Sequence, residues 1–342
     1  MLWSSEGVSR TWQVTPTYGL QTVLDQVLPG DTVELGPGIY REAVRTRRPG
    51  TAGLPITVQG PSTAILNGAE GASRVLEVNH AHYRFKGFTV DGLHGDPERR
   101  DGYRNKLVYL TGIEPGVGVR DVQFVGLRLR NAGGECLRIR YLASDIEVRD
   151  NVISNCGIHA FRFGAEGKNG EGIYIGTSSN QWFDGRNPSG EPDRSTRIWV
   201  RGNAIDTQGN ECIEVKEGSS LVRIEANRCS GQLDPASGGI SLRGDLNTVR
   251  DNEIKNNRGV GIRVGGHRVA GVQYGLGNQI VNNVMEGNQA GGLKLLVAPQ
   301  AAICGNALNS NGDKMVLGAG KSRVDPSRTC TPAIAAEPVR VQ

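Results

Sequence analysis

Three glutamates are spaced so that a repeating fold would stack their carboxylates. Glu135, Glu171 and Glu211 each stand two residues before the first apolar residue of a short alternating segment. If these segments pair as strands about 4.8 Å apart, adjacent carboxylates repel by about 3 kcal/mol at an effective dielectric constant of about 20. A bound cation, a basic partner or a raised pKa must relieve this repulsion. Hard cations such as calcium prefer oxygen ligands of this kind.

Basic residues occupy the outward positions of the same segments. Lys216 and Arg243 fall at equivalent positions on successive segments, so carboxylates or an anionic ligand must lie beside them. One interpretation is structural: the glutamates cap turns and pair with Arg140, Lys216 and Arg243. The other, which we favour, is a site for a metal ion or for the carboxylate of a substrate. A row of cations at a fixed rise also matches a linear anionic polymer, and its members are Arg138, Arg140, Lys216, Arg243, Arg263 and Lys294.

The alternation of apolar residues in these segments indicates β-strands. An apolar residue at every second position places one row of side chains inside the fold and the other row toward solvent. Strands are predicted over 137–140, 173–176, 213–216, 240–243, 262–265 and 293–296. Corresponding residues of these strands should therefore form columns on one wall of the molecule.

A second pattern recurs in step with the strands: apolar, any, apolar, two residues, Asn, any, apolar. Its asparagines are Asn151, Asn203, Asn227, Asn252, Asn283 and Asn306, at spacings of 52, 24, 25, 31 and 23 residues. The spacings predict a coil of about 23–25 residues with occasional insertions, the interval of 52 being one coil and an insertion. We expect the asparagines to adopt left-handed conformations at bends and to bond to one another up the column.

These repeats predict an all-β chain folded as a single-stranded right-handed parallel β-helix, a solenoid that forms one domain over 1–342. The 49 glycines and the low aromatic content of 5% suit short strands joined by tight turns. Residues 19–28 have helical apolar spacing, so 19–30 should form an N-terminal cap. Residues 313–342 lose the pattern and are expected to form a C-terminal tail. Two insertions, 155–170 and 177–196, flank the same coil and should border one region of its outer face.

Composition argues against several partners. The net charge is only +4 and no basic block alternates with aromatic residues, which argues against nucleic-acid binding. No apolar run approaches the ~18–20 residues of a membrane span. The first five residues contain no apolar stretch of the signal-peptide kind, so we expect no signal peptide in this sequence.

The six cysteines indicate a location outside the cytosol. None forms a C-x-x-C pair, and consecutive pairs are separated by 20, 17 and 26 residues. Bridges between nearby coils are therefore expected, sequential pairing being one of about fifteen connectivities. Buried free thiols are the alternative. Disulfides would place the chain in an oxidising compartment, and we expect a secreted monomer.

Two stretches resemble known β-helix proteins. Residues 19–25 (GLQTVLD) and 29–40 (PGDTVELGPGIY) resemble the entry segment of secreted right-handed β-helix enzymes that act on carbohydrates. Residues 170–176 (GEGIYIG), with Trp182 beyond them, are similar to a broad set of secreted β-helix proteins.

A third stretch carries residues with chemistry. Residues 211–219 (ECIEVKEGS), followed by 239–244 (GISLRG), resemble the alginate lyase and chondroitinase B family of polysaccharide lyases. The resemblance implies that Glu211 is a calcium ligand, Lys216 the Brønsted base, and Arg243 an acid or stabiliser. That family has a second glutamate seven residues before the lysine, where this chain has Gly209, so Glu171 or Glu214 would serve instead. Its arginine is usually followed by His-Gly, whereas 244–245 is Gly-Asp here.

We therefore expect an enzyme that cleaves a uronic-acid polysaccharide by β-elimination. The uronate carboxylate must be neutralised, by Arg140 directly or by calcium held by Glu171, Glu211 and Glu214. Lys216 would then remove the C5 proton. This requires a lowered pKa of Lys216, which Arg243 favours and the carboxylates oppose.

The remaining roles fall to neighbouring side chains. Arg243, a water or Tyr174 would protonate the leaving glycosidic oxygen. Contacts with the anionic polysaccharide are expected from Arg138, Arg140, Arg263, Lys294 and Trp182. Three alternatives stay open: a C5-epimerase that shares the first step, a glycoside hydrolase using paired carboxylates such as Glu211 and Glu214, and a non-catalytic module that binds polymer on the cation row.

Overall fold

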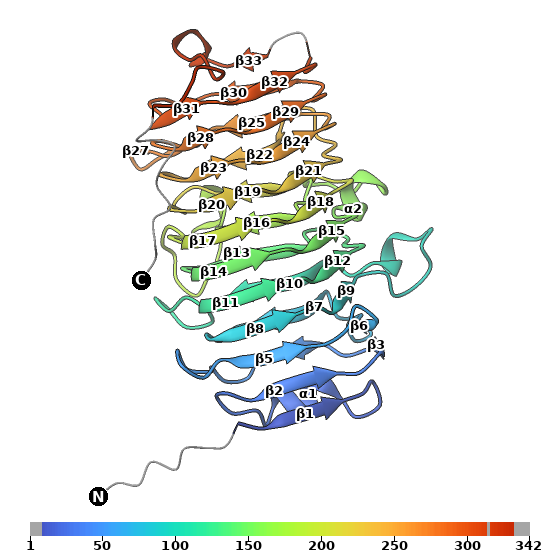
Figure 1. The fold of residues 1–342 in the computed structure, drawn as a ribbon. Coiled ribbons are helices and arrows are strands. Elements are labelled where there is room, and N and C mark those ends of the chain that lie inside the picture. The colour runs from blue at the N-terminus through green and yellow to red at the C-terminus, as the bar shows by residue number, and fades with distance from the viewer. Residues whose placement is uncertain (1–8, 313–314, 332–342) are drawn as a thin grey trace, which may run out of the picture.

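The computed structural model describes residues 9–312 and 315–331, which form a solenoid of three parallel sheets (Figure 1). Successive coils add one strand to each sheet, so strands far apart in the sequence pair in register. The expected all-β solenoid is confirmed. No helix in the described part of the chain is long and apolar enough to cross a membrane. The expectation of no signal peptide concerns the first five residues, which fall within 1–8 and so lie outside the described residues.

The three sheets run the length of the solenoid. The first sheet is β1 (Thr11–Val14), β2 (Thr32–Leu35), β5 (Ile56–Gln59), β8 (Tyr83–Lys86), β11 (Arg120–Val125), β14 (Ser144–Arg149), β17 (Thr196–Arg201), β20 (Arg223–Glu225), β23 (Thr248–Arg250), β28 (Gln279–Val281) and β31 (Ala302–Cys304). The second sheet is β4 (Val44–Arg45), β7 (Arg74–Val78), β10 (Lys106–Thr111), β13 (Leu137–Arg140), β16 (Ile173–Ile175), β19 (Ile213–Val215), β22 (Gly238–Leu242), β25 (Val260–Val264), β30 (Gly291–Leu295) and β33 (Val316–Leu317). The third sheet is β3 (Gly38–Tyr40), β6 (Ala64–Leu66), β9 (Thr89–Asp91), β12 (Arg128–Arg130), β15 (Val152–Ser154), β18 (Ala204–Asp206), β21 (Arg228–Ser230), β24 (Glu253–Lys255), β29 (Val284–Glu286) and β32 (Ala307–Asn309).

Elements outside the three sheets are short. They are the antiparallel hairpin of β26 (Arg268–Val269) and β27 (Val272–Gln273), the helices α1 (Leu20–Leu24) and α2 (Ile158–Phe161), and the 3₁₀ turns η1 (Arg100–Gly102), η2 (Ser179–Gln181) and η3 (Lys321–Arg323).

Alternation along each strand builds the core. In the second sheet, Ile139, Ile175 and Val215 pair in register and are fully buried inside the coil. Burying such side chains is worth about 1.5–3 kcal/mol each, and only one register keeps the whole column inside. The same register therefore fixes which side chains stack on the outer face.

The asparagines form a buried ladder at one corner of the coil. The Asn203 side-chain amide donates to Asn227 Oδ1 at 2.9 Å, and Asn227 donates to Asn252 at 3.0 Å. The expectation of stacking is confirmed, but the expectation of left-handed asparagines is wrong. Positive φ angles occur one residue earlier, as at Gly202 (65°) and Ala226 (53°). The preceding residue makes the bend, which leaves the asparagine free to bond along the column.

The two ends differ from the sequence-based outline. Helix α1 is shorter than 19–28, but its buried face contacts β1 and β4 at the N-terminal end of the coil (Figure 1). At the other end β33 extends the second sheet by pairing with β30. Part of the expected tail therefore continues the solenoid, while 313–314 and 332–342 lie outside the described residues.

All six cysteines form disulfides. The pairs are sequential: Cys136–Cys156, Cys212–Cys229 and Cys304–Cys330. Cys156 lies at the base of the first insertion and Cys212 lies beside Glu211, so two bridges brace the coils that carry the stacked charges.

Candidate active site

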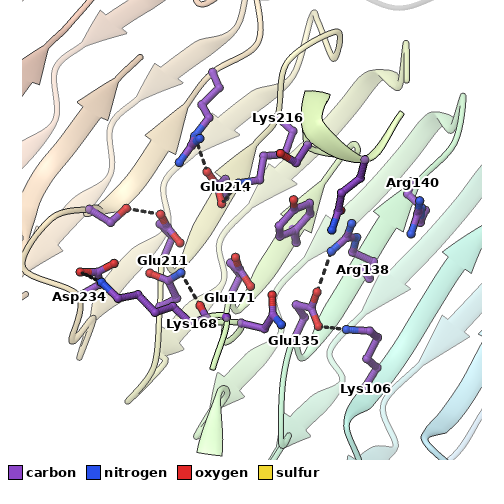
Figure 2. Close-up of a pocket in the computed structure, with 18 of the residues that line it drawn as sticks. Lys106, Glu135, Arg138, Arg140, Lys168, Glu171, Glu211, Glu214, Lys216 and Asp234 are labelled. Atoms are coloured by element: carbon purple, nitrogen blue, oxygen red, sulfur yellow. Dashed lines mark hydrogen bonds and ion pairs between the residues drawn. The ribbon is translucent and has the colours of Figure 1, made fainter. Parts of the chain in front are cut away.

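A cavity of about 670 Å³ lies over the outer face of the second sheet (Figure 2). It extends along the solenoid from Arg74 on β7 to Arg263 on β25. Lys168 and its neighbours from the first insertion line one side of the cavity. Ser178 and Arg186 of the second insertion also line it. Both insertions thus border the same stretch of sheet.

Strand register brings the expected residues together on this wall. Arg138 on β13 pairs with Tyr174 on β16, which pairs with Glu214 on β19. The backbone N–H groups of Lys216 and Arg243 donate to the strands of the preceding coils, at Ile175 O and Val215 O. Lys216 and Arg243 therefore occupy the same position on adjacent coils, and both line the cavity.

The charged wall is more enclosed than the sequence indicated. The charged side chains point away from the core, yet Glu135 and Glu214 are each 1% exposed and Lys216 is 7% exposed. Alternation predicts which way a side chain points, but the insertions and the neighbouring charged groups decide how much water reaches it. Interactions between these charges are consequently stronger than they would be on an open surface.

Glu135 is neutralised by two cations. Its carboxylate contacts Lys106 Nζ and accepts a hydrogen bond from Arg138 Nη1 at 2.7 Å. Burial by itself would raise the pKa of Glu135, but Lys106 and Arg138 overcome it and lower the pKa to about 2. Glu135 therefore pairs with basic residues, as the structural interpretation predicted. Its partners are Lys106 and Arg138, however, and not Arg140.

Glu214 is shared by the two candidate catalytic cations. Lys216 Nζ lies 2.7 Å from one carboxylate oxygen, and Arg243 Nε lies 3.0 Å from the other. Burial would lower the pKa of Lys216, but the adjoining Glu214 carboxylate outweighs it and the pKa is raised. The lowering that a lysine base needs is therefore absent while this ion pair is intact.

Glu171 and Glu211 form no ion pair with any described residue. Glu171 accepts a hydrogen bond from the Gly170 backbone N–H at 2.9 Å, and Glu211 accepts one from the Ser237 hydroxyl. The other oxygen of Glu211 is buried without a partner among the described atoms. Burial and then neighbouring carboxylates raise the pKa of Glu171 to about 8 and that of Glu211 to about 7.

These carboxylates meet the requirements of a hard cation. Oxygen atoms of Glu171, Glu211 and Glu214 all lie within 4.8 Å of one another. Two oxygens that bind one calcium ion at 2.3–2.6 Å can be separated by up to about 5 Å. The short separation, the repulsion between the carboxylates and the unpartnered Glu211 oxygen fit a bound cation, so this buried acidic cluster could hold a metal ion.

Glu171→Gln is expected to flatten the dependence of stability on pH. With raised pKa values at Glu171 and Glu211, the folded chain holds more protons than the unfolded chain from about pH 4.5 to about pH 8. Stability should therefore fall as pH rises through this window, and glutamine removes part of that loss. Melting temperatures measured with a chelator should show it. Calcium should then raise the melting temperature of the unmodified chain more than that of the variant. If the melting temperatures of the unmodified chain and of Glu171→Gln changed equally with pH, this interpretation would be contradicted.

Tyr174 stands between two cations. The Arg138 guanidinium lies 3.6 Å from the centre of its ring, and Lys216 Nζ lies 4.8 Å from it. Burial raises the pKa of Tyr174 to about 12, so its hydroxyl is protonated at neutral pH. Within the described chain this hydroxyl has no hydrogen-bond partner, and Tyr174 lines the cavity, where a ligand can reach it.

The remaining predicted substrate contacts divide into two groups. Arg138, Arg140 and Arg263 line the cavity. Lys294 lies on the next coil beyond Arg263 and is outside the lining. Trp182 is also outside it, because the indole is 1% exposed beneath the second insertion, where Nε1 donates to Thr177 O at 2.9 Å. The indole thus anchors the loop in this arrangement and does not face the cavity.

Several lining or supporting residues were not predicted from the sequence. Arg74, Lys106 and Tyr109 extend the charged wall toward the N-terminus. Alternation over 109–111 was a usable signal for Tyr109, whereas the adjacent buried residues Leu107 and Val108 break the alternation after Lys106. Asn187, which binds Arg140 from the second insertion, lies in a loop without any repeat and gave no signal.

The fold and the charged cavity define a class of protein: parallel β-helices with a polar cavity on the outer face of one sheet. The chain belongs to the right-handed β-helix family, whose model, described as "Right handed beta helix region", matches residues 117–324. The predicted right-handed β-helix is thus confirmed. No curated protein matches the chain.

Solved structures share this fold. An alginate lyase from Paenibacillus sp. str. FPU-7 superposes with a TM-score of 0.71 at 23% identity, covering 91% of this chain and 98% of that one. The PL6 family alginate lyase AlyGC gives 0.54 at 17% identity, covering 90% of this chain and 40% of that one. ORF18 of Geobacillus virus E2 gives 0.58 at 13% identity, covering 90% and 60%. Polysaccharide lyases are thus among the chain's structural matches.

Proposed function

We propose that this chain is a polysaccharide lyase that cleaves a uronic-acid polymer by β-elimination. The observation that carries the proposal is the meeting of Lys216, Arg243 and Tyr174 in one partly open cavity beside a buried acidic cluster. Similarity to alginate lyase structures supports the choice among enzymes that act on polysaccharides. The three disulfides support a location outside the cytosol.

The reaction divides among three side chains. Lys216 takes the proton from C5 of the uronate as the C5–H bond breaks. The electron pair forms the C4–C5 double bond, and the C4–O bond to the leaving sugar breaks. Tyr174 or Arg243 delivers a proton to the departing oxygen. The neutral Tyr174 hydroxyl suits this role because its raised pKa keeps the proton available until negative charge develops on the oxygen.

The acidic cluster would neutralise the substrate carboxylate indirectly. Glu171, Glu211 and Glu214 would hold calcium, which when bound supplies positive charge opposite the uronate carboxylate. Glu214 belongs both to this cluster and to the ion pair with Lys216. Any ligand that draws the Glu214 carboxylate away from Lys216 lowers the pKa of the lysine and favours its basic form.

Incubation with a panel of uronate polymers tests the proposal. Alginate, pectate, glucuronan and dermatan-type chains are supplied with calcium or with a chelator, and the absorbance of the unsaturated product is followed. We expect at least one polymer to give this product, with a lower rate in chelator. Absence of the product from every polymer would reject the lyase.

One alternative has a specific observation in its favour. The pKa of Glu211 is raised to about 7 and that of Glu214 is lowered, which is the division between acid and base that a glycoside hydrolase needs. A hydrolase would release reducing ends from the same panel without the unsaturated absorbance, so one set of reactions separates the two activities.

A further inference from the structure

Arg140 is a buried cation without a carboxylate partner. The side chain lines the cavity and is only 4% exposed, yet it forms no ion pair with any residue the structure describes. Nearby cations differ: Arg138 pairs with Glu135, and Lys216 pairs with Glu214. An uncompensated buried charge costs several kcal/mol, so the position favours an anion from outside the chain.

Neutral acceptors hold the Arg140 guanidinium in one orientation. Nη1 donates to the Tyr109 hydroxyl at 2.9 Å, while Nε and Nη2 donate to Asn187 Oδ1 at 3.0 and 2.5 Å. These bonds use three of the five N–H groups of an arginine. One N–H therefore remains on each Nη nitrogen, and a carboxylate can accept both.

This guanidinium lies away from the reacting residues. Arg140 and Lys216 occupy the same outward position on strands two coils apart, which corresponds to about 10 Å. The residue at this position on the coil between them is Gly176, which has no side chain to bridge the two cations. An added Cβ there would lie only 2.2 Å from Ser219 Oγ. Figure 2 shows Arg140 separated from Glu171, Glu211 and Glu214.

Contacts also draw Arg140 away from Lys216. Its Tyr109 partner lies one coil further toward the N-terminus, and the Arg74 guanidinium stacks 3.8 Å from the centre of the Tyr109 ring. Direct neutralisation by Arg140 of the sugar that reacts, as the sequence suggested, is therefore disfavoured. The separation matches a neighbouring part of the same polymer.

We propose that Arg140, held by Tyr109 and Asn187, is a second carboxylate subsite that binds an acidic sugar beyond the one that reacts. This inference rests on the proposed function and deepens it, because it requires a substrate with carboxylates on at least two of its sugars. Affinity should accordingly depend on oligosaccharide length.

Binding without turnover tests the subsite. Arg140→Gln is introduced into a Lys216→Ala background, and calorimetry measures affinity for uronate oligosaccharides from two to six sugars. We expect the longer oligosaccharides to bind about 10- to 100-fold more weakly, as loss of hydrogen bonds to a charged group predicts, and disaccharide affinity to stay unchanged. Arg128→Gln is the matched control, because Arg128 is exposed on β12 of the third sheet.

A second variant addresses a failure of Arg140→Gln to fold. Asn187→Asp places a carboxylate against Arg140 within the chain, so it should preserve the melting temperature and still weaken binding of the longer oligosaccharides. Unchanged affinity for them in the folded variants overturns the subsite. A chain that binds oligouronates with this length dependence but never yields unsaturated product contradicts the proposed lyase alone.

Discussion

Lys216→Ala should lower the rate of β-elimination by about 10²- to 10⁴-fold, the usual contribution of a general base. Lys216 is the candidate base whose ammonium group shares a carboxylate with the acidic cluster. Removing it should leave polymer binding, because Arg138, Arg140 and Arg263 still line the cavity. Initial rates of unsaturated-product formation measure the first effect, and co-sedimentation with insoluble polymer measures the second.

A matched substitution separates chemistry from general damage. Lys255 lies on β24 of the third sheet and pairs there with Glu286 at 3.2 Å. Lys255→Ala should keep the full rate, since exposed ion pairs contribute about 0–1 kcal/mol to stability and this one is remote from the cavity. If Lys216→Ala also kept the full rate, the assignment of the base would have to be abandoned.

The second large effect concerns stability: Glu135→Ala should lower the free energy of unfolding by about 3–5 kcal/mol. The substitution removes the carboxylate from a buried group of three charges and leaves Lys106 and Arg138 without their counter-ion. The Arg138 that remains should also loosen its stacking on Tyr174, so activity should fall in the protein that stays folded. Urea unfolding at neutral pH measures the loss.

The control for Glu135→Ala is a substitution of a carboxylate on the same sheet whose ion-pair partners are exposed to solvent. Glu77 pairs with Arg45 and Arg74, whose side chains are 53% and 36% exposed. Glu77→Ala should therefore cost about 0–1 kcal/mol. If the two variants lost equal stability, the buried Glu135 group would not be the stabilising feature inferred from its contacts.

Acid should reproduce the loss at Glu135. The folded-state pKa of about 2 lies below the ordinary value of 4.5, so this carboxylate stabilises the fold above about pH 4.5 and ceases to do so as pH falls toward 2. The stability difference between the unmodified chain and Glu135→Ala should shrink across that interval.

The solenoid and its charged wall were predictable because both follow from a repeat. Alternation in 213–216 and 240–243 assigned an inward and an outward row, and the recurrence of the coil placed Lys216 and Arg243 at one position of adjacent strands. Stacking of Asn203 on Asn227 was equally predictable from the sequence, because it depends on the position of each asparagine within the coil.

The tertiary structure alone decided which charges are satisfied. Glu135, Glu171 and Glu211 are equivalent in the sequence pattern, yet only Glu135 meets cations, since Lys106 and Arg138 reach it. The two others are left to repel each other, which is why a bound cation would be stabilised there.

Features of the insertions were also beyond the sequence. Trp182 turns inward, and Asn187 accepts hydrogen bonds from Arg140. Neither position belongs to a repeat, so no pattern predicted these contacts. Backbone periodicity determines where a side chain starts and which way it points. Its partners and its burial depend on side-chain conformation and on how non-repeating loops pack, and these are settled only when the whole chain is folded.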